Sequence, residues 1–94
     1  MFEIKKAADS VIVLSGRFDA SQVERARPIL DAISQSCTLD FSELDYISSA
    51  GLGLLLGAQK RLVDTGHSMK LTRMNKNVRD VFRYAGFDKI FEIT

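Results

Sequence analysis

The sequence predicts an α/β domain: a four-stranded sheet in the order 1-2-3-4, with helices mainly on one face. Short apolar runs alternate with longer stretches of helical periodicity along the chain, which is typical of βαβ units. The strand-like runs 37–41 and 68–73 carry apolar residues at alternate positions only. Each should therefore bury one face of the sheet and leave the other partly solvated, with right-handed connections between the parallel strands.

Composition and charge exclude several classes of protein. A length of 94 residues suits one domain, 1–94, and a hydrophobic content of 46% excludes intrinsic disorder. Thirteen basic and twelve acidic residues give a net charge of +1, so no overall field attracts nucleic acid or an anionic membrane. The longest apolar run, 50–58, is too short for membrane insertion. With a lone Cys37 and no signal-peptide pattern, we expect a soluble, cytoplasmic protein.

The first part of the chain predicts a hairpin followed by a helix. An edge strand over 2–5 and a turn at 8–10 lead into a central strand that starts at 11 and that Gly16 ends. Ser21 is the expected cap of the first helix, and Pro28 predicts a kink or a late start near Arg27. The expected inward face of this helix consists of Val23, Ala26, Leu30 and Ile33.

The second part predicts two further strands and two further helices. A strand over 37–41 leads through a polar connection with Glu43 and Asp45 into a helix over 49–64, which Thr65-Gly66 terminates. A strand follows over 68–73. The last helix is expected to have Asn77 as its cap, to place Val78, Val81, Phe82 and Ala85 inward, and to end at Gly86. The residues expected to close the fold are Phe87, Ile90, Phe91 and Ile93.

The helix over 49–64 has two contrasting sides when it is projected at 100° per residue. The expected core stripe consists of Leu52, Leu55, Leu56, Leu62 and Val63, with Gln59 in its middle and no partner evident for that amide. The expected outward side consists of Gly53, Leu54, Gly57, Lys60, Arg61 and Asp64. Two outward glycines cost helix stability, but they would let another backbone approach closely.

Familiar catalytic and cofactor motifs are absent. The glycines over 51–57 have the wrong spacing for a dinucleotide fingerprint, and no P-loop or hydrolase elbow is present. The only histidine, His67, lies in a polar turn and is expected to be exposed. With one histidine and one cysteine, neither a metal site nor a Cys–His dyad is expected. We therefore expect no cofactor and no catalytic residue.

Two serines, Ser48 and Ser49, stand at the mouth of the central helix. Backbone N–H groups are unpaired there, and the helix dipole is positive. The pair is therefore either a helix cap or an acceptor site for phosphate.

These residues carry a resemblance to a known family. The segment DFSELDYISSAGLGLLL, residues 40–56, resembles the signature of the STAS domain, in particular the single-domain anti-sigma-factor antagonists of bacteria. The turn 16–19 and the ending 85–91 support the resemblance, which covers the whole chain. It implies a mixed sheet with helices wound as a β/α superhelix.

The resemblance also implies a phosphoacceptor and a recognition surface. The acceptor is the hydroxyl two residues before the first glycine of the Gly-Leu-Gly element, which here is Ser49, with Ser48 as the alternative. The chain has Ser48 where many members have an aspartate, and Ala50 where many have a second serine. Asp19 is either a turn or cap residue or part of the recognition surface. The full expected partner surface is Asp19, Ser48, Ser49, Gly51, Gly53, Leu54 and Gly57.

The implied function is partner switching. When unphosphorylated, such a protein binds an anti-sigma factor that is a serine kinase of the histidine-kinase-like ATPase type, and so releases a sigma factor. Phosphorylation ends the binding, and a serine phosphatase restores it. Two alternatives stay open: a permanently bound STAS subunit of a transporter or other complex on the cytoplasmic side, and a small enzyme or nucleotide-binding protein.

Overall fold

The computed structural model covers residues 1–94 and contains a five-stranded sheet in the order β1-β2-β3-β4-β5. The strands are β1 Glu3–Ala8, β2 Val11–Phe18, β3 Cys37–Ile47, β4 Met69–Thr72 and β5 Glu92–Ile93. The helices are α1 Val23–Asp31, α2 Ser49–Asp64 and α3 Lys76–Tyr84, with short 3-10 helices η1 Ala20–Gln22 and η2 Phe87–Lys89. β1 is antiparallel to β2, and the other neighbours are parallel. The expected order is confirmed, and a fifth strand extends the sheet beyond the four expected.

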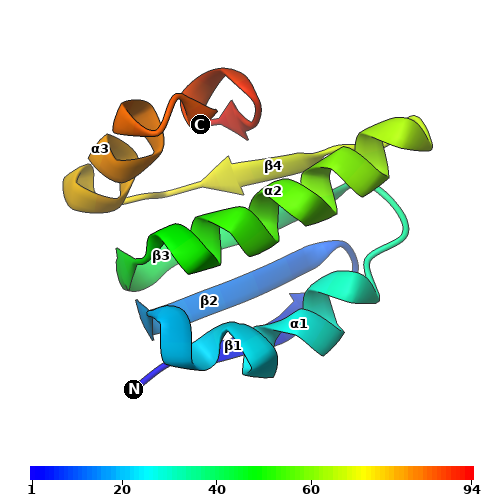
Figure 1. The fold of residues 1–94 in the computed structure, drawn as a ribbon. Helices are drawn as coiled ribbons and strands as arrows, with labels where there is room; N and C mark the ends of the chain where they lie inside the picture. The colour runs from blue at the N-terminus through cyan, green and yellow to red at the C-terminus, as the bar shows by residue number, and fades with distance from the viewer.

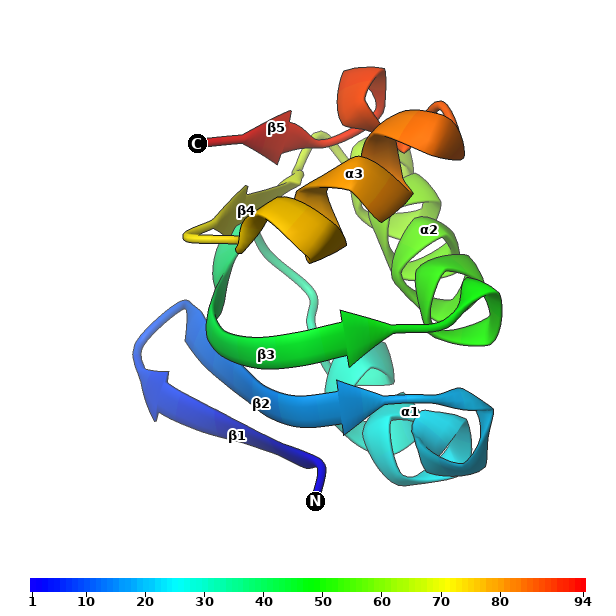
Figure 2. The same cartoon turned by 90° about the vertical axis from the view of Figure 1, so that its left-hand side faces the viewer.

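The helices α1 and α2 lie side by side against one face of the sheet (Figures 1 and 2). A single cluster of 23 buried apolar residues fills the space between sheet and helices. Because side chains alternate along a strand, Asp40 and Lys70 face the opposite side of the sheet from Leu39 and Leu71. Lys70 is exposed, so the one-sided pattern expected of β4 is confirmed, but Asp40 is only 8% exposed, so the opposite face of β3 is covered at this position. None of the helices combines the length and the apolarity that crossing a membrane requires.

The second strand is expected to end at Gly16, but β2 continues to Phe18. Gly16 has φ +81°, and the register between β2 and β3 shifts between Gly16 and Arg17. A Cβ at this position would also collide with the backbone of Met1. Glycine therefore suits this position, the extra residue at the register shift lies on β3, and β2 carries on to bury Phe18 in the core.

The third strand is likewise longer than expected and runs to Ile47. Glu43 and Asp45 are therefore exposed strand residues and do not form a loop. The buried residues Leu44 and Ile47 do not continue the period-two pattern of Leu39 and Phe41, because the register against β2 shifts twice. Such irregularities hide the strand from a search for strict alternation.

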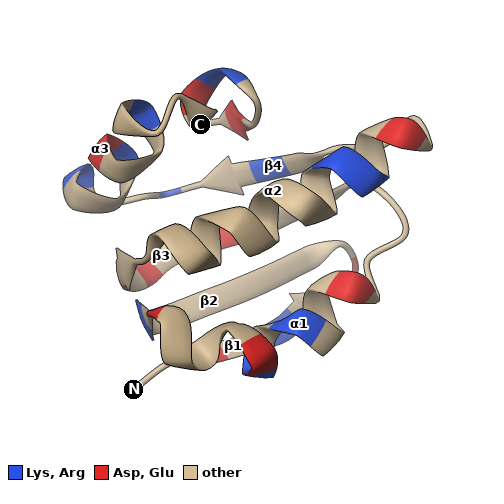
Figure 3. Ribbon diagram, in the orientation of Figure 1, with Lys and Arg blue, Asp and Glu red and all other residues tan.

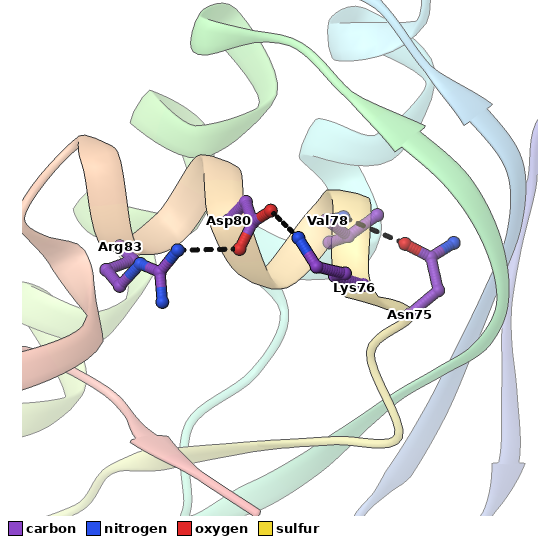
Figure 4. A network of polar contacts seen from close by, with 5 residues as sticks. All are labelled: Asn75, Lys76, Val78, Asp80 and Arg83. Carbon is purple, nitrogen blue, oxygen red and sulfur yellow. Dashed lines mark hydrogen bonds and ion pairs between the residues drawn. The ribbon is translucent and has the colours of Figure 1, made fainter.

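Two helix starts differ from the expected ones. Asp19 rather than Ser21 is the capping residue here: it caps η1, which leads into α1, and its side chain accepts a hydrogen bond from the Ser21 amide. The α-helix then begins at Val23 and runs on through Pro28, so the late start near Arg27 is wrong. The cap of α3 is Asn75 rather than Asn77: its Oδ1 accepts from the Val78 amide at 2.8 Å (Figure 4).

The bounds expected for α2, 49–64, are confirmed, and Gly66 follows the helix with φ +83°. Val63 is 55% exposed and does not belong to the core stripe. It lies 100° around the helix from the buried Leu62, so only one of the two can be central. Ile90 and Ala85, also expected inside, are exposed as well.

Candidate functional site

Ser48 and Ser49, at the junction between β3 and α2, have different structural roles. Ser48 is the N-cap residue, with extended backbone, and its Oγ accepts a hydrogen bond from the Gly51 amide at 3.1 Å. Ser49 is the first residue of the helix, and its side chain is exposed. Since Ser48 supplies the cap, the hydroxyl of Ser49 has no structural role to lose.

The first turn of α2 is suited to accept negative charge. The amide of Leu52 donates to the carbonyl of Ser48 at 2.9 Å, whereas the amides of Ser49 and Ala50 have no acceptor within the protein. No acidic residue occupies this turn. Unpaired amides and the positive end of the helix dipole therefore face solvent beside the Ser49 hydroxyl.

The end of β2 lies directly beside this serine loop. Phe18 and Ile47 are register partners, and the amide of Ser48 donates to the carbonyl of Phe18 at 2.9 Å. Asp19 follows Phe18, and its carboxylate accepts from the Ser21 amide at 3.0 Å. The fold thus brings the Asp19 turn and Ser48 together, and it confirms that Asp19 has a capping role.

Gly51 is buried, unlike the other glycines of α2. A Cβ built on it would lie 3.2 Å from both the Phe18 ring and Cγ1 of Ile47, two residues that are themselves buried. Gly51 therefore lets the start of α2 pack closely on the ends of β2 and β3. It supports the expected partner surface from beneath and is not part of the exposed surface itself.

A groove of about 420 Å³ runs between α1 and α2. Its lining residues are Val23, Arg27 and Asp31 from α1, and Ala50, Gly53, Leu54, Gly57 and Ala58 from α2. A Cβ added to Gly53 or Gly57 would meet no atom within 4 Å, so both glycines open onto free space. Leu54 is half-buried and packs against the core while it lines the groove.

The residues of α2 that line the groove carry no charged side chains. Figure 3 shows that the N-terminal part of the helix is uncharged and that its charges gather toward the C-terminal end. On the α1 side, Arg27 pairs with Glu24 at 2.9 Å, and this hydrogen bond lowers the pKa of the Glu24 carboxyl. The groove is therefore a mostly neutral surface with charges at one rim.

Arg61 has a role that the sequence does not reveal. Its guanidinium donates to the carbonyl of Ile33 at 2.6 Å and to that of Leu30 at 2.9 Å. It thereby pairs carbonyl groups at the C-terminal end of α1, where an arginine also complements the helix dipole. Arg61 is exposed, as expected of an outward residue, and it also ties α2 to the end of α1.

The remaining chemistry-bearing side chains lie apart from the serine loop. His67 is half-buried rather than exposed, and its Nδ1 lies 3.4 Å from Oγ of Ser36. Cys37 is buried, and burial raises the pKa of its thiol. No three potential metal-ligating side chains of the structure gather in one place.

Sequence comparison connects this geometry to known proteins. The chain matches the family model described as "Mlab, STAS domain" over residues 2–93. It is also 34% identical over 82 residues to BtrV of Bordetella bronchiseptica, which is named as an anti-sigma factor antagonist. That alignment covers 87% of this chain and 70% of the relative.

Solved structures have the same fold. The unphosphorylated anti-sigma factor antagonist SpoIIAA matches with a TM-score of 0.79 and 25% identity, covering 100% of this chain and 88% of that one. Phosphorylated SpoIIAA from Bacillus matches with a TM-score of 0.70 and 22% identity, covering 100% and 91%. A Thermotoga maritima structure matches with a TM-score of 0.80 and 21% identity, covering 98% and 84%. The family model spans nearly the whole sequence, and the chain therefore belongs to the STAS domain family.

Proposed function

We propose that this protein is an anti-sigma factor antagonist that works as a phosphorylation-controlled binding module and is not an enzyme. The observation that supports the proposal is that two adjacent serines have different structural roles. Ser48 caps α2, while Ser49 presents an exposed hydroxyl beside unpaired amides. A phosphate on Ser49 would leave the cap intact, which is what a reversible switch requires.

In the unphosphorylated state, the serine loop and the groove between α1 and α2 form the surface for the partner. Gly53 and Gly57 permit close approach of another backbone, and Leu54 supplies an apolar contact. Asp19 borders this surface because the carbonyl of Phe18, the residue before it, accepts a hydrogen bond from the Ser48 amide. The partner in this proposal is an anti-sigma factor that is also a serine kinase of the histidine-kinase-like ATPase type.

Phosphorylation of Ser49 would act on the interface rather than on the fold. A phosphoserine carries about −1.5 to −2 charges at neutral pH. The start of α2 tolerates such a charge, because its free amides and dipole favour anions. A partner surface that is complementary to a neutral hydroxyl would not tolerate the charge and size of a phosphate. A loss of about 3 kcal/mol in binding free energy weakens association more than a hundredfold.

A serine phosphatase would remove the phosphate and restore binding. The proposal places the cycle in the cytoplasm, where ATP is available to the kinase. In this proposal the kinase and phosphatase activities belong to partner proteins, and the STAS domain contributes the hydroxyl that is phosphorylated and the surface that is bound.

The test combines phosphorylation with binding. The protein is incubated with a candidate kinase of this type and ATP, and intact mass is measured. One phosphate is expected on the parent protein and none on the Ser49→Ala variant, which should still bind the kinase. Ser49→Asp should weaken binding with an unchanged circular dichroism spectrum.

Ser48→Ala is the matched control, because it removes the neighbouring hydroxyl. It should lose stability through loss of the cap and yet still accept one phosphate. Labelling that survives in Ser49→Ala and disappears in Ser48→Ala would move the acceptor to Ser48. Tight binding to transporter subunits that is indifferent to Ser49→Asp would support the alternative of a permanently bound STAS subunit.

A further inference from the structure

Arg79, on α3, is unusual among the arginines of this chain. The other six each contact a partner: a carboxylate, a backbone carbonyl or an aromatic ring. The Arg79 side chain has no such partner and is exposed. A guanidinium that carries five N–H donors and is fixed to nothing is available to an external acceptor.

Arg79 does not stand alone, because it shares a hollow with Arg83. The hollow has a volume of about 290 Å³ and is lined by Arg79, Arg83, Asp88 and Ile93. Arg83 donates to Oδ1 of Asp80 at 3.0 Å, while Lys76 donates to Oδ2 of the same carboxylate at 2.8 Å (Figure 4). The guanidinium of Arg83 is therefore held in place, with further N–H donors still free.

An exposed aromatic ring adjoins Arg83. Tyr84 is 79% exposed, and the guanidinium carbon of Arg83 lies 5.5 Å from the centroid of its ring. Ile93 contributes an apolar wall to the hollow. Arginine and tyrosine are enriched in the central parts of protein–protein interfaces and among their most important contacts.

We propose that the surface formed by Arg79, Arg83 and Tyr84 of α3, Asp88 of η2 and Ile93 of β5 is a second protein-binding surface. It takes an acidic segment of a partner protein, with one carboxylate bound between Arg79 and Arg83 and a neighbouring apolar side chain against Tyr84 and Ile93. This surface uses neither the serine loop nor the groove between α1 and α2. It therefore holds whether or not Ser49 is phosphorylated.

The charges around the hollow favour a protein partner over a nucleic acid. Asp80 and Asp88 lie among the arginines, and Glu92 follows shortly after them in the chain. A continuous polyphosphate would meet these carboxylates at every step, whereas a single carboxylate can sit between the two guanidinium groups. The net charge of the whole chain, only +1, adds no wider attraction for a polyanion.

The experiment is an NMR titration of the ¹⁵N-labelled full chain with a synthetic peptide that carries one Glu-Phe pair between Gly and Ser residues. A peptide of the same length with Lys-Phe in place of Glu-Phe serves as the charge-reversed probe. The expected result is saturable shifts of the Nε–H signals of Arg79 and Arg83 and of the Tyr84 and Ile93 amides, with the acidic peptide only. Arg79→Gln should weaken this binding about tenfold, the loss expected for a charged hydrogen bond.

Lys60→Gln is the matched control, because it removes one exposed positive charge from α2 and should leave peptide binding unchanged. Ser49→Asp should also bind as the parent does, which separates this surface from the proposed switch. Since the Arg79 side chain makes no hydrogen bond, ion pair or cation–π contact, Arg79→Gln should leave the melting temperature unchanged. Shifts spread over all cationic side chains, an equal loss in Lys60→Gln, or no saturable shift would each overturn the proposal. Tighter binding of an oligouridylate to the same residues would overturn it in favour of nucleic acid.

Discussion

The Met69 amide, at the start of β4, donates a 2.8 Å hydrogen bond to Oε1 of Gln59 on α2. Nε2 of the same side chain donates to the carbonyl of Ile90 at 3.0 Å. Gln59 is only 4% exposed, so it joins three separate segments from inside the apolar stripe of α2. Both ends of the amide are satisfied, which explains why a polar residue is tolerated there.

The first prediction follows from these two bonds. Gln59→Leu retains most of the side-chain volume but leaves the Met69 amide and the Ile90 carbonyl without their partner. The Met69 amide lies in a buried bond and costs about 1–3 kcal/mol when unpaired, whereas the Ile90 carbonyl is only part-buried and can be hydrated, so the free energy of unfolding should fall by about 1–3 kcal/mol. Urea denaturation measures this change. The matched control is Gln35→Leu, since Gln35 is exposed and makes no hydrogen bond, and it should stay within about 0.5 kcal/mol of the parent.

The second prediction concerns the stability of the serine loop, apart from any phosphorylation. Ser48→Ala removes the acceptor of the Gly51 amide and should lower the free energy of unfolding by about 1 kcal/mol. Ser49→Ala removes an exposed hydroxyl from the first helical position and should change it by less than about 0.5 kcal/mol. Thermal melts of the two variants make the comparison. Equal losses would contradict the separate roles assigned to the two serines.

Capping residues, apolar periodicity and glycine terminators in the sequence predict those helix bounds that depend on neighbouring residues alone. The bounds of α2 are confirmed because a serine cap, an apolar stripe and a Thr-Gly ending all agree over one stretch. The capping residues of η1, which leads into α1, and of α3 are each missed by two residues, because Asp19 and Asn75 compete with Ser21 and Asn77 as equally good capping types. The choice at Asn75 involves a tertiary bond, from its Nδ2 to the carbonyl of Leu44 at 3.1 Å.

Interactions between distant parts of the chain account for the rest. The bulges opposite β2 hide the second half of β3, and β5 is too short for any pattern. In the candidate site, the sequence predicts the positions of Ser49, Gly53 and Gly57 at the start and along the exposed side of α2. It cannot predict that Arg61 reaches the end of α1 or that Gly51 lies under Phe18, because both depend on how elements pack.

The third prediction separates two roles of Asp19. Asp19→Ala should lower the free energy of unfolding by about 1 kcal/mol through loss of the bonds to Ser21. Asp19→Asn keeps a capping side chain and removes the charge, so stability should recover. If Asp19 also belongs to the recognition surface, Asp19→Asn should still weaken binding to the kinase partner. Parent-like affinity in the stable Asn variant would leave Asp19 with a capping role only.

The fourth prediction concerns the ionisation of Asp80 on α3. The hydrogen bond from Lys76 is the main reason that the pKa of Asp80 is lowered; burial opposes it, and the charges of Lys76 and Arg83 lower the pKa further. A carboxyl with a depressed folded pKa contributes stability that is present above its unfolded pKa, near about 4, and lost as the pH falls through the folded value. Carboxyl ¹³C titration should show the shift directly. Lys76→Gln should raise the pKa of Asp80, whereas Lys60→Gln should leave it unchanged.

The last prediction compares two glycines of the same helix. Gly57 opens onto free space, so Gly57→Ala should raise the free energy of unfolding by something under about 1 kcal/mol. In Gly51→Ala, the new methyl group would press on the buried Phe18 ring and Ile47 from 3.2 Å. Overpacking there should outweigh the gain in helix propensity and lower the stability by about 1 kcal/mol. Chemical denaturation tests the opposite signs.

Binding to the kinase partner then decides what the groove between α1 and α2 does. If a partner backbone approaches Gly57, the methyl group of Gly57→Ala should weaken binding in a protein that is more stable than its parent, so unfolding cannot explain the loss. Leu54→Ala should weaken binding by about 1–2 kcal/mol, but Leu54 also packs against the core, so its effect must be read beside its stability. Parent-like affinity in both variants would confine the interface to the serine loop and the Asp19 turn.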